Sequence, residues 1–459
     1  MPALFLLTGL LPAFAGPAQD IAAEFGTLGA PPKVAVACSP IREALSVAEA
    51  MGTLSDGPTR PELEALLRAA SDPSAEAAQG VDLDGGFLAL DANGTSIARL
   101  PIKGGLNDAI ALFSKPDAPE WSLDGERAVR IEDDGKRSIL TVHDGTARIR
   151  TGPVADSKAT QSIQLPDSLD ALPDGDGCAL WLYGGDDPDA PAFLRNPITL
   201  WMPFSDDAPA ELRVQLPPHR DRATRPDITP PLAVSSPARP TAVFTLGVPP
   251  ARILNDPAVQ KALPEAVRGQ LDFGDALDGV GAGTVGAVFS GPAGPVFVVA
   301  VPVTTKRGRP VSRRRIQAEV DSSLGAGTFS KIAARAVIID RYTTDLELPN
   351  GMTFTMRAER GRLYLGNARD FVLGAADGLG DPWLDEAGMD WAASHAVTLK
   401  GEGPLPGLTQ PLVVQLGAGT EGDVLLVQLK LDPSIRDPRV AAAFRAMTEA
   451  RKKRKNRPL

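Results

Sequence analysis

The alternation of apolar and polar runs predicts a strand pair that the chain contains twice. Residues 197–204 are mainly apolar, pass through a polar turn and return as a second apolar run at 211–216. Residues 411–416 pass through a Gly/Thr/Glu turn and return at 424–431. Short apolar runs bounded by Pro, Gly and Asp are typical of strands. Because the two pairs begin 214 residues apart and share this order, we predict one structural unit built twice.

Turn signals ahead of each strand pair recur with the same spacing. Gly135 and Gly145 mark two turns of a predicted three-strand meander, and Gly351 and Gly361 mark the matching turns 216 residues later. Both pairs of glycines are ten residues apart, which two unlike sequences rarely produce by chance. Each unit is therefore predicted to contain a hairpin, a helix, a meander and a terminal hairpin.

This order of elements predicts an α+β fold in two tandem repeated domains, each a mainly antiparallel sheet with helices on one face. The first domain covers residues 32–217, and the second covers 240–450 and ends in a C-terminal helix. Residues 218–239 are rich in proline and are predicted to be a semi-extended linker. Residues 451–459 form a basic tail, whose cations complement the end of the last helix and could attract an anionic lipid or polymer.

Composition and charge narrow the function classes. The 459 residues exceed one domain, and 43% of them are hydrophobic, which is enough to form two cores. A net charge of −10 argues against general nucleic-acid binding, because a polyphosphate backbone requires a positive face. With three histidines and two cysteines, no ordinary zinc cluster can be assembled, so no metal site and no cofactor are predicted.

The N-terminus predicts export. Residues 2–16 are apolar, too short to span a bilayer, and contain a small-x-small motif at 13–15. We therefore predict a signal peptide over 1–15, although its positive n-region is missing; a short buried helix is the alternative. No other run reaches transmembrane length. The Ala/Gly/Pro-heavy composition suggests a bacterial source, and the expected location is the periplasm or the outside of the cell.

Export would determine the oxidation state that the two cysteines can reach. Cys38 and Cys178 both lie on strand-like apolar runs, and an oxidising compartment would let them form a disulfide. Two buried thiols that fill core space are the alternative. Because sequence does not show whether the two Cα atoms come within bridging distance, both interpretations stay open.

A basic insertion distinguishes the second unit. Residues 304–315 connect its hairpin to its helix, where the first unit uses only 102–106. Ser312 resembles an N-cap residue, which would place three arginines in the first helical turn, against the helix dipole. Backbone N–H groups and guanidinium groups can together bind phosphate, carboxylate or an acidic partner; a solvated loop is the alternative. The candidate anion-binding or partner-binding residues are Lys306, Arg307, Arg309, Ser312, Arg313, Arg314 and Arg315.

No catalytic residue is predicted. The chain has neither a Gly-x-Ser-x-Gly nucleophile elbow nor a phosphate-binding Gly-x4-Gly-Lys-Ser/Thr loop. His143 and His395 are interpreted as polar residues at strand edges. The acidic runs at 174–176 and 186–189 lack the twelfth-position Glu of a calcium loop and fit ordinary turns.

Together these features favour an exported, non-enzymatic binding or scaffolding protein of the bacterial envelope. Its expected partner is a protein or an anionic envelope component. A carrier of a lipid or other apolar ligand is the first alternative, and it requires a large, mostly aliphatic cavity. A carboxylate-dependent hydrolase is the second, and it requires acidic side chains that converge with perturbed pKa values. The sequence predicts no oligomeric state.

Overall fold

The computed structural model describes a little over half of the chain. The described residues are 17, 21, 24, 32–44, 80–92, 94–114, 119–153, 175–185, 192–205, 208–216, 228–249, 282–292, 294–305, 309–325, 335–403 and 412–431. The predicted signal peptide, C-terminal helix and basic tail lie outside them.

The elements follow each other in two series. The first contains β1 (Val34–Ser39), β2 (Phe87–Ala92), β3 (Thr95–Pro101), α5 (Leu106–Phe113), β4 (Ser122–Asp124), β5 (Arg127–Ile131), β6 (Arg137–His143), β7 (Thr146–Gly152), β8 (Gly177–Leu182), η1 (Ala192–Arg195), β9 (Ile198–Pro203) and β10 (Ala210–Gln215). The second contains β11 (Ser235–Ser236), β12 (Ala242–Leu246), β13 (Thr284–Gly291), β14 (Gly294–Pro302), α10 (Arg313–Gly325), β15 (Arg335–Asp340), β16 (Thr343–Glu347), β17 (Thr353–Glu359), β18 (Arg362–Gly366), α11 (Arg369–Asp377), β19 (Asp381–Pro382), α12 (Glu386–Ser394), β20 (Val397–Gly403), β21 (Leu412–Glu421) and β22 (Val424–Leu431).

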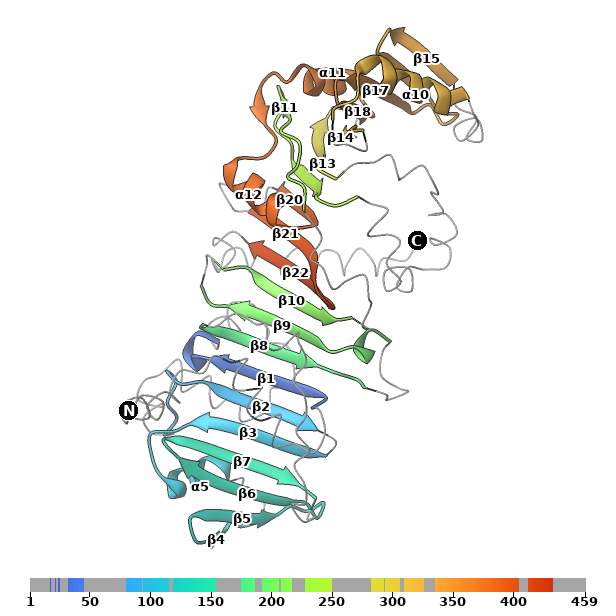
Figure 1. The fold of residues 1–459 in the computed structure, drawn as a ribbon. Coiled ribbons are helices and arrows are strands. Elements are labelled where there is room, and N and C mark those ends of the chain that lie inside the picture. The colour runs from blue at the N-terminus through green and yellow to red at the C-terminus, as the bar shows by residue number, and fades with distance from the viewer. Residues whose placement is uncertain are drawn as a thin grey trace, which may run out of the picture.

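Twenty of these strands form one continuous sheet, and every pairing in it is antiparallel (Figure 1). Counted outward from the middle, the first half reads β10-β9-β8-β1-β2-β3-β7-β6-β5-β4. The second half reads β22-β21-β20-β12-β13-β14-β18-β17-β16-β15. The described residues are thus mainly antiparallel sheet with few helices, and both halves place their strands in the same order.

The two halves meet edge to edge in the middle of the sheet. β10 pairs with β22 over six residue pairs, from Ala210 opposite Leu429 to Gln215 opposite Val424. These hydrogen bonds make the sheet continuous across the junction, and Figure 1 shows β4 and β15 at its two far ends.

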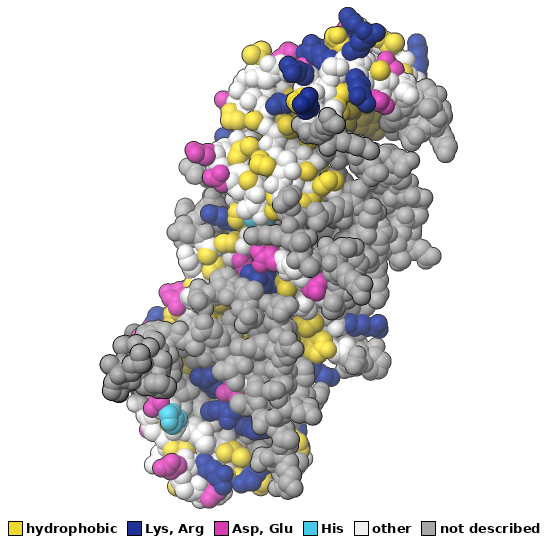
Figure 2. Space-filling model, in the orientation of Figure 1, with side chains coloured by type: hydrophobic (Ala, Val, Ile, Leu, Met, Phe, Trp, Pro, Cys, Tyr) yellow, Lys and Arg dark blue, Asp and Glu magenta, His cyan; other side chains and the backbone are white. Residues whose placement is uncertain are grey.

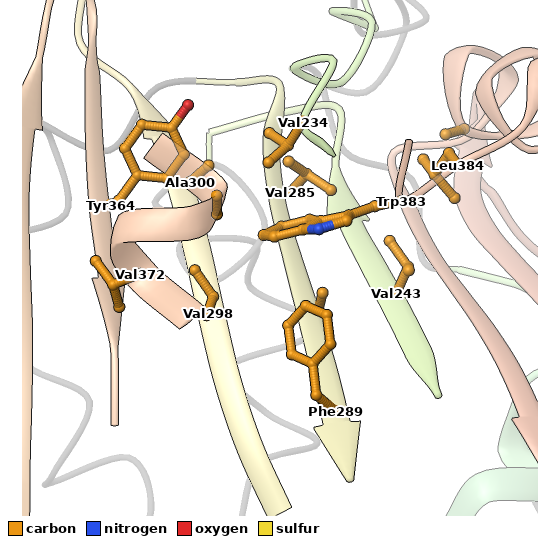
Figure 3. Close-up of a cluster of buried hydrophobic side chains, with 13 residues drawn as sticks. Val234, Val243, Val285, Phe289, Val298, Ala300, Tyr364, Val372, Trp383 and Leu384 are labelled. Atoms are coloured by element: carbon orange, nitrogen blue, oxygen red, sulfur yellow. The ribbon is translucent and has the colours of Figure 1, made fainter. Parts of the chain in front are cut away.

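Each half has its own apolar core. In the first, Trp181 and Trp201 are almost fully buried and pack with alanines of β1 and leucines of β2. In the second, Trp383 lies between strands and helices, with its ring centroid 5.8 Å from that of Phe289 (Figure 3). The indole N–H of Trp383 donates to Ser236 Oγ at 2.9 Å, so this large side chain is buried with its polar atom satisfied.

The helices do not gather on one face of the sheet, contrary to the prediction. Ile316 of α10 packs with Ala358, whereas Val372 of α11 packs with Tyr364. Because Arg357 lies opposite Tyr364, and neighbouring strand residues point to opposite faces, Ala358 and Tyr364 lie on opposite faces. Both faces of β17 and β18 carry buried side chains, so each face needs a helix to cover it.

Two other segments differ in detail from the sequence-based interpretation. Residues 228–239 fall within the predicted linker, yet Val234 is buried in the second core and β11 pairs with β19. The rest of the predicted linker lies outside the described residues. The predicted Gly/Thr/Glu turn is instead the end of β21, which continues to Glu421 and turns at Gly422.

Candidate functional site

The basic insertion leads into α10. The carbonyl oxygen of Ser312 accepts hydrogen bonds from the N–H groups of Arg315 and Ile316, both at 3.0 Å, so Ser312 occupies the position that precedes the first helical residue. Arg313, Arg314 and Arg315 follow in the first turn. Lys306 and Arg307, also named as candidates, lie outside the described residues.

Arg313 is held by neighbours that are distant from it in the sequence. Its guanidinium pairs with the carboxylate of Glu359, and its Cζ lies 5.3 Å from the centre of the Tyr342 ring. Glu359 also accepts a hydrogen bond from Arg357 Nε at 3.1 Å. Arg313 therefore fastens the start of α10 to the sheet, and its charge is already compensated.

Arg309, Arg314 and Arg315 are in a different position. All three are exposed, and none of them forms an ion pair in the part of the chain that the structure describes. Positive charge at the start of a helix opposes the helix dipole at about 0.3–1 kcal/mol per residue. The described contacts therefore give these arginines no stabilising role in the fold. Their guanidinium N–H groups remain available to an anion.

Other arginines of the second half lie at the same end of the sheet. The N–H of Gly361 donates to the Val311 carbonyl at 2.8 Å, which places the exposed Arg360 beside the loop that enters α10. Arg341 lies in the turn between β15 and β16, with its Cζ 5.4 Å from the centre of the Tyr342 ring.

We call this region the basic end, and Figure 2 shows Lys and Arg side chains gathered there, at the top of the molecule. Its members are Arg309, Arg313, Arg314, Arg315, Arg341, Arg357 and Arg360.

Two acidic side chains, Asp340 and Glu359, offset part of this charge. Asp340 accepts hydrogen bonds from the Tyr342 N–H at 2.7 Å and from Thr343 Oγ1 at 2.9 Å, and it pairs with Arg357 at 3.0 Å. The Tyr342 N–H in particular, with the Thr343 hydroxyl and the Arg357 charge, outweighs desolvation and lowers the pKa of Asp340 below 3.8. Asp340 is therefore ionised at neutral pH, and the basic end keeps a net positive charge.

A small pocket of about 230 Å³ opens near the start of α12. Two ion pairs line it: Arg239 with Glu402 at 2.9 Å and Lys400 with Asp385 at 3.1 Å. Burial alone would raise the pKa of Asp385, but the Gly388 N–H and the Lys400 ammonium outweigh it and hold the pKa below 3.8.

The pocket matches neither alternative function. A general acid of a carboxylate-dependent hydrolase needs a raised pKa, whereas Asp385 is ionised and its charge is compensated by Lys400. The carrier hypothesis needs a large aliphatic cavity, and this pocket is small and lined by charged pairs.

A buried polar network crosses the junction of the two halves. Arg213 binds Glu211 through two hydrogen bonds of 2.8 and 2.9 Å, and Gln428 Nε2 donates to Glu211 at 2.6 Å. His395 is buried at the end of α12 rather than exposed at a strand edge as interpreted from the sequence; its Nε2 lies 2.6 Å from Gln428 Oε1. Gly417 leaves room for its ring, because a Cβ there would lie 2.3 Å from His395 Cδ2.

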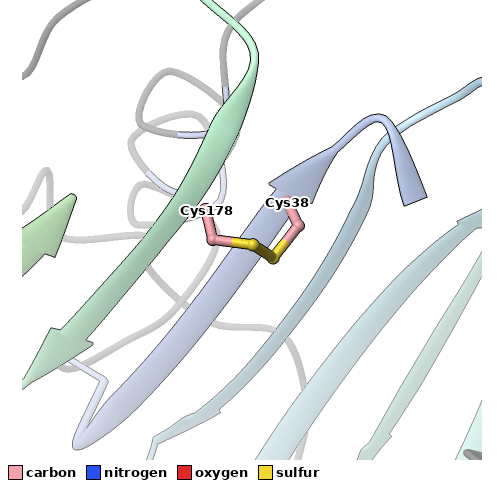
Figure 4. The surroundings of a disulfide bond; sticks show 2 residues. All are labelled: Cys38 and Cys178. Carbon is pink, nitrogen blue, oxygen red and sulfur yellow. A yellow bond between two sulfur atoms is a disulfide. The ribbon is translucent and has the colours of Figure 1, made fainter. Parts of the chain in front are cut away.

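The two cysteines lie directly opposite each other on β1 and β8 and are joined by a disulfide (Figure 4). The bond links positions 140 residues apart in the sequence. Among the described residues, no group of three or more His, Cys, Asp or Glu side chains is arranged to hold a metal ion. The same residues contain no helix with the length and apolar character that crossing a membrane requires.

Comparison with known proteins assigns no family. No protein-family model matches the chain, and no curated protein matches it significantly. A solved structure of TP0453, crystal form IV, is 11% identical, with a TM-score of 0.24 over 42% of this chain and 80% of that one. Crystal forms III and I are each 8% identical, with TM-scores of 0.20 and 0.21, and cover 77% of this chain and 98% and 96% of theirs. Likeness at this level assigns neither a fold nor a function.

Proposed function

We propose that this protein is an exported, non-enzymatic binding protein of the bacterial envelope that engages an anionic partner through its basic end. The observation that supports this most directly is that Arg309, Arg314 and Arg315 are exposed, without ion pairs among the described residues, where a compact fold gains nothing from positive charge. Arg360 adds to the same surface. Guanidinium groups bind carboxylate, phosphate or sulfate oxygens through paired hydrogen bonds, so anionic groups are the matching chemistry.

We further propose that the two halves are copies of one unit. Their identical strand order supports this, and so does the register at the junction. Arg213 lies opposite Leu426, which is also its counterpart when the two halves are aligned at an offset of 213 residues. Equivalent residues face each other only when two like units meet around a two-fold axis. The chain then resembles a dimer whose subunits are covalently linked.

Export is supported by the disulfide as well as by the apolar N-terminus. Disulfides persist in oxidising compartments such as the periplasm and are rare in the cytosol. The bond between Cys38 and Cys178 connects two neighbouring strands in the first core, where it is compatible with the surrounding sheet. A periplasmic or secreted location follows from this proposal.

A titration with a defined polyanion tests the anion site. The full chain is titrated with fluorescently labelled dextran sulfate at low and physiological ionic strength. Replacing Arg309, Arg314 and Arg315 by glutamine should weaken binding at least tenfold, because each lost cation near a polyanion removes on the order of 1 kcal/mol.

A matched control comes from the first half. Arg150 and Arg195 are exposed and form no ion pair within the described residues, so replacing both by glutamine removes charge elsewhere on the molecule. That variant should bind like the unmodified chain. An equal loss per charge removed, with two charges removed here and three at the basic end, would mean that net charge alone governs binding. No loss in either variant would refute the proposed site.

A further inference from the structure

The outermost strand of the second half is exposed and apolar. β15 pairs with β16 and with no second strand among those described, and its sequence is Arg-Ala-Val-Ile-Ile-Asp. Ile338 is 74% exposed and Ile339 is 40% exposed. Large apolar side chains that cluster at one exposed site mark interaction surfaces more often than isolated ones do.

The opposite end of the sheet is built differently. There the outermost strand, β4, has only three residues, one of which is acidic. Short, charged edges are the usual protection of a sheet against unwanted pairing. Leu123 is its one large apolar side chain and is also exposed. The apolar run of β15 is therefore a feature of the basic end and not of sheet edges in this molecule generally.

The geometry of β15 disfavours the addition of another strand. Its register with β16 shifts between Ile338 and Asp340, so Ile339 is an extra residue that interrupts the ladder. Bulges of this kind twist an edge away from regular pairing. The carboxylate of Asp340 is also committed to Tyr342, Thr343 and Arg357, which fixes the end of the strand.

The exposed isoleucine shares a face with the helix that carries the free arginines. Ile338 lies opposite Thr344, and Thr344 Oγ1 accepts a hydrogen bond from Gln317 of α10 at 3.1 Å. Residues directly opposite in an antiparallel pair point to the same face, so Ile338 lies on the face that α10 covers. Arg314 and Arg315 occupy the first turn of that helix.

Further cations lie on either side of the isoleucines. Arg335 begins β15 and Arg341 follows it, and both are exposed. The guanidinium carbons of Arg313 and Arg341 lie 5.3 and 5.4 Å from the centre of the Tyr342 ring. Apolar side chains surrounded by cations, with an aromatic ring beside them, match the composition of an anionic bilayer, in which apolar chains lie beneath negative headgroups.

We propose that the partner of the basic end is the surface of an anionic lipid bilayer. Ile338 and Ile339 enter the boundary between headgroups and acyl chains, and the arginines contact the lipid phosphates. The inference rests on the proposed anion-binding function and narrows it to one class of partner. Peripheral binding of this kind combines buried apolar area with electrostatic attraction, so both the isoleucines and the arginines should be required.

Co-sedimentation of the full chain with large vesicles tests the inference. One set of vesicles is pure phosphatidylcholine, and the other contains phosphatidylcholine and phosphatidylglycerol at about seven to three. We expect partition onto the anionic vesicles only. Replacing Ile338 and Ile339 by threonine should lower that partition at least tenfold, since two apolar side chains would no longer enter the boundary.

The control variant is Leu123→Thr, which changes an exposed apolar residue on the opposite edge and should bind anionic vesicles like the unmodified chain. All variants should keep the same thermal unfolding midpoint, because the changed side chains are exposed. Equal binding of the isoleucine double variant would overturn the inference, since adsorption would then be purely electrostatic. Equal binding to both kinds of vesicle would overturn it as well.

The outcome also separates this inference from the function on which it rests. If the chain binds dextran sulfate through its arginines but does not bind vesicles, the membrane inference fails and the anion site stands. If it binds neither, both fail. If sedimentation velocity without vesicles shows a dimer that the isoleucine substitutions abolish, β15 docks on a second copy, which also overturns the inference.

Discussion

The ion pair at the junction offers the sharpest test of how the two halves are held together. The side chains of Glu211 and Arg213 are only 6% and 7% exposed, and two hydrogen bonds of 2.8 and 2.9 Å join them. Gln428 adds a third bond to Glu211 from β22. Glu421 lies 3.6 Å from Arg213 Nη1, which has no hydrogen-bond partner of its own. Replacing Arg213 by methionine would leave Glu211 charged and buried with Gln428 as its remaining partner.

That substitution is expected to lower the free energy of unfolding by about 3–5 kcal/mol. This is the usual effect of removing one partner of a buried ion pair and leaving the other charged. The reverse change, Glu211→Leu, should cost less, because Glu421 remains 3.6 Å from Arg213 Nη1 and compensates part of its charge. Replacing both residues together should cost far less than the sum of the two single changes, since no uncompensated charge then stays buried.

Urea unfolding, followed by tryptophan fluorescence with the disulfide intact, measures the four proteins of this cycle. A coupling energy of about 2 kcal/mol or more between the two sites would support a buried, mutually compensated pair. Additive effects, or single changes that cost less than about 1 kcal/mol, would refute it, because the pair would then behave like an exposed one.

Three further predictions concern individual contacts. Gly417→Ala should destabilise the protein by about 1–3 kcal/mol in urea unfolding, because the new Cβ would collide with His395, whereas Gly401→Ala, with open space around it, should cost much less. Reduction of the disulfide should lower the urea midpoint by an amount equivalent to about 2–4 kcal/mol; an unchanged midpoint would contradict this. Asp385→Asn should lower the thermal midpoint near pH 7, where the carboxylate pairs with Lys400. Because the pKa of Asp385 is lowered in the folded state, the difference should shrink below pH 3.8, and a difference that persists there would contradict the electrostatic origin.

Local features of the fold could be predicted from the sequence, because they depend on short-range chemistry. Gly135, Gly145, Gly351 and Gly361 all occupy turns with positive φ, between 71° and 80°, a conformation that glycine adopts without strain. The join between β10 and β22 could not be predicted, since it pairs segments more than two hundred residues apart. Nor could the two-sided placement of α10 and α11, which depends on which strand faces are buried.

In the candidate site, too, only the features that depend on neighbouring residues in the sequence could be predicted. The exposed arginines of the insertion lie within seven residues of one another in the sequence, so their charge could be recognised directly. The structural role of Arg313 could not, because Glu359 and Tyr342 reach it only through the folded sheet. Arg360 was visible only as the first residue of a turn, and its place beside Val311 depends on a backbone hydrogen bond from Gly361.

Hydrogen–deuterium exchange with and without bound dextran sulfate tests the central proposal most directly. We predict slower exchange on binding at the start of α10 and in the turn that carries Arg360, with β5 and β6 in the first half unchanged. Protection that appears in the first half, or none at the basic end under conditions where the polyanion is bound, would contradict the proposal that the basic end holds the anionic partner.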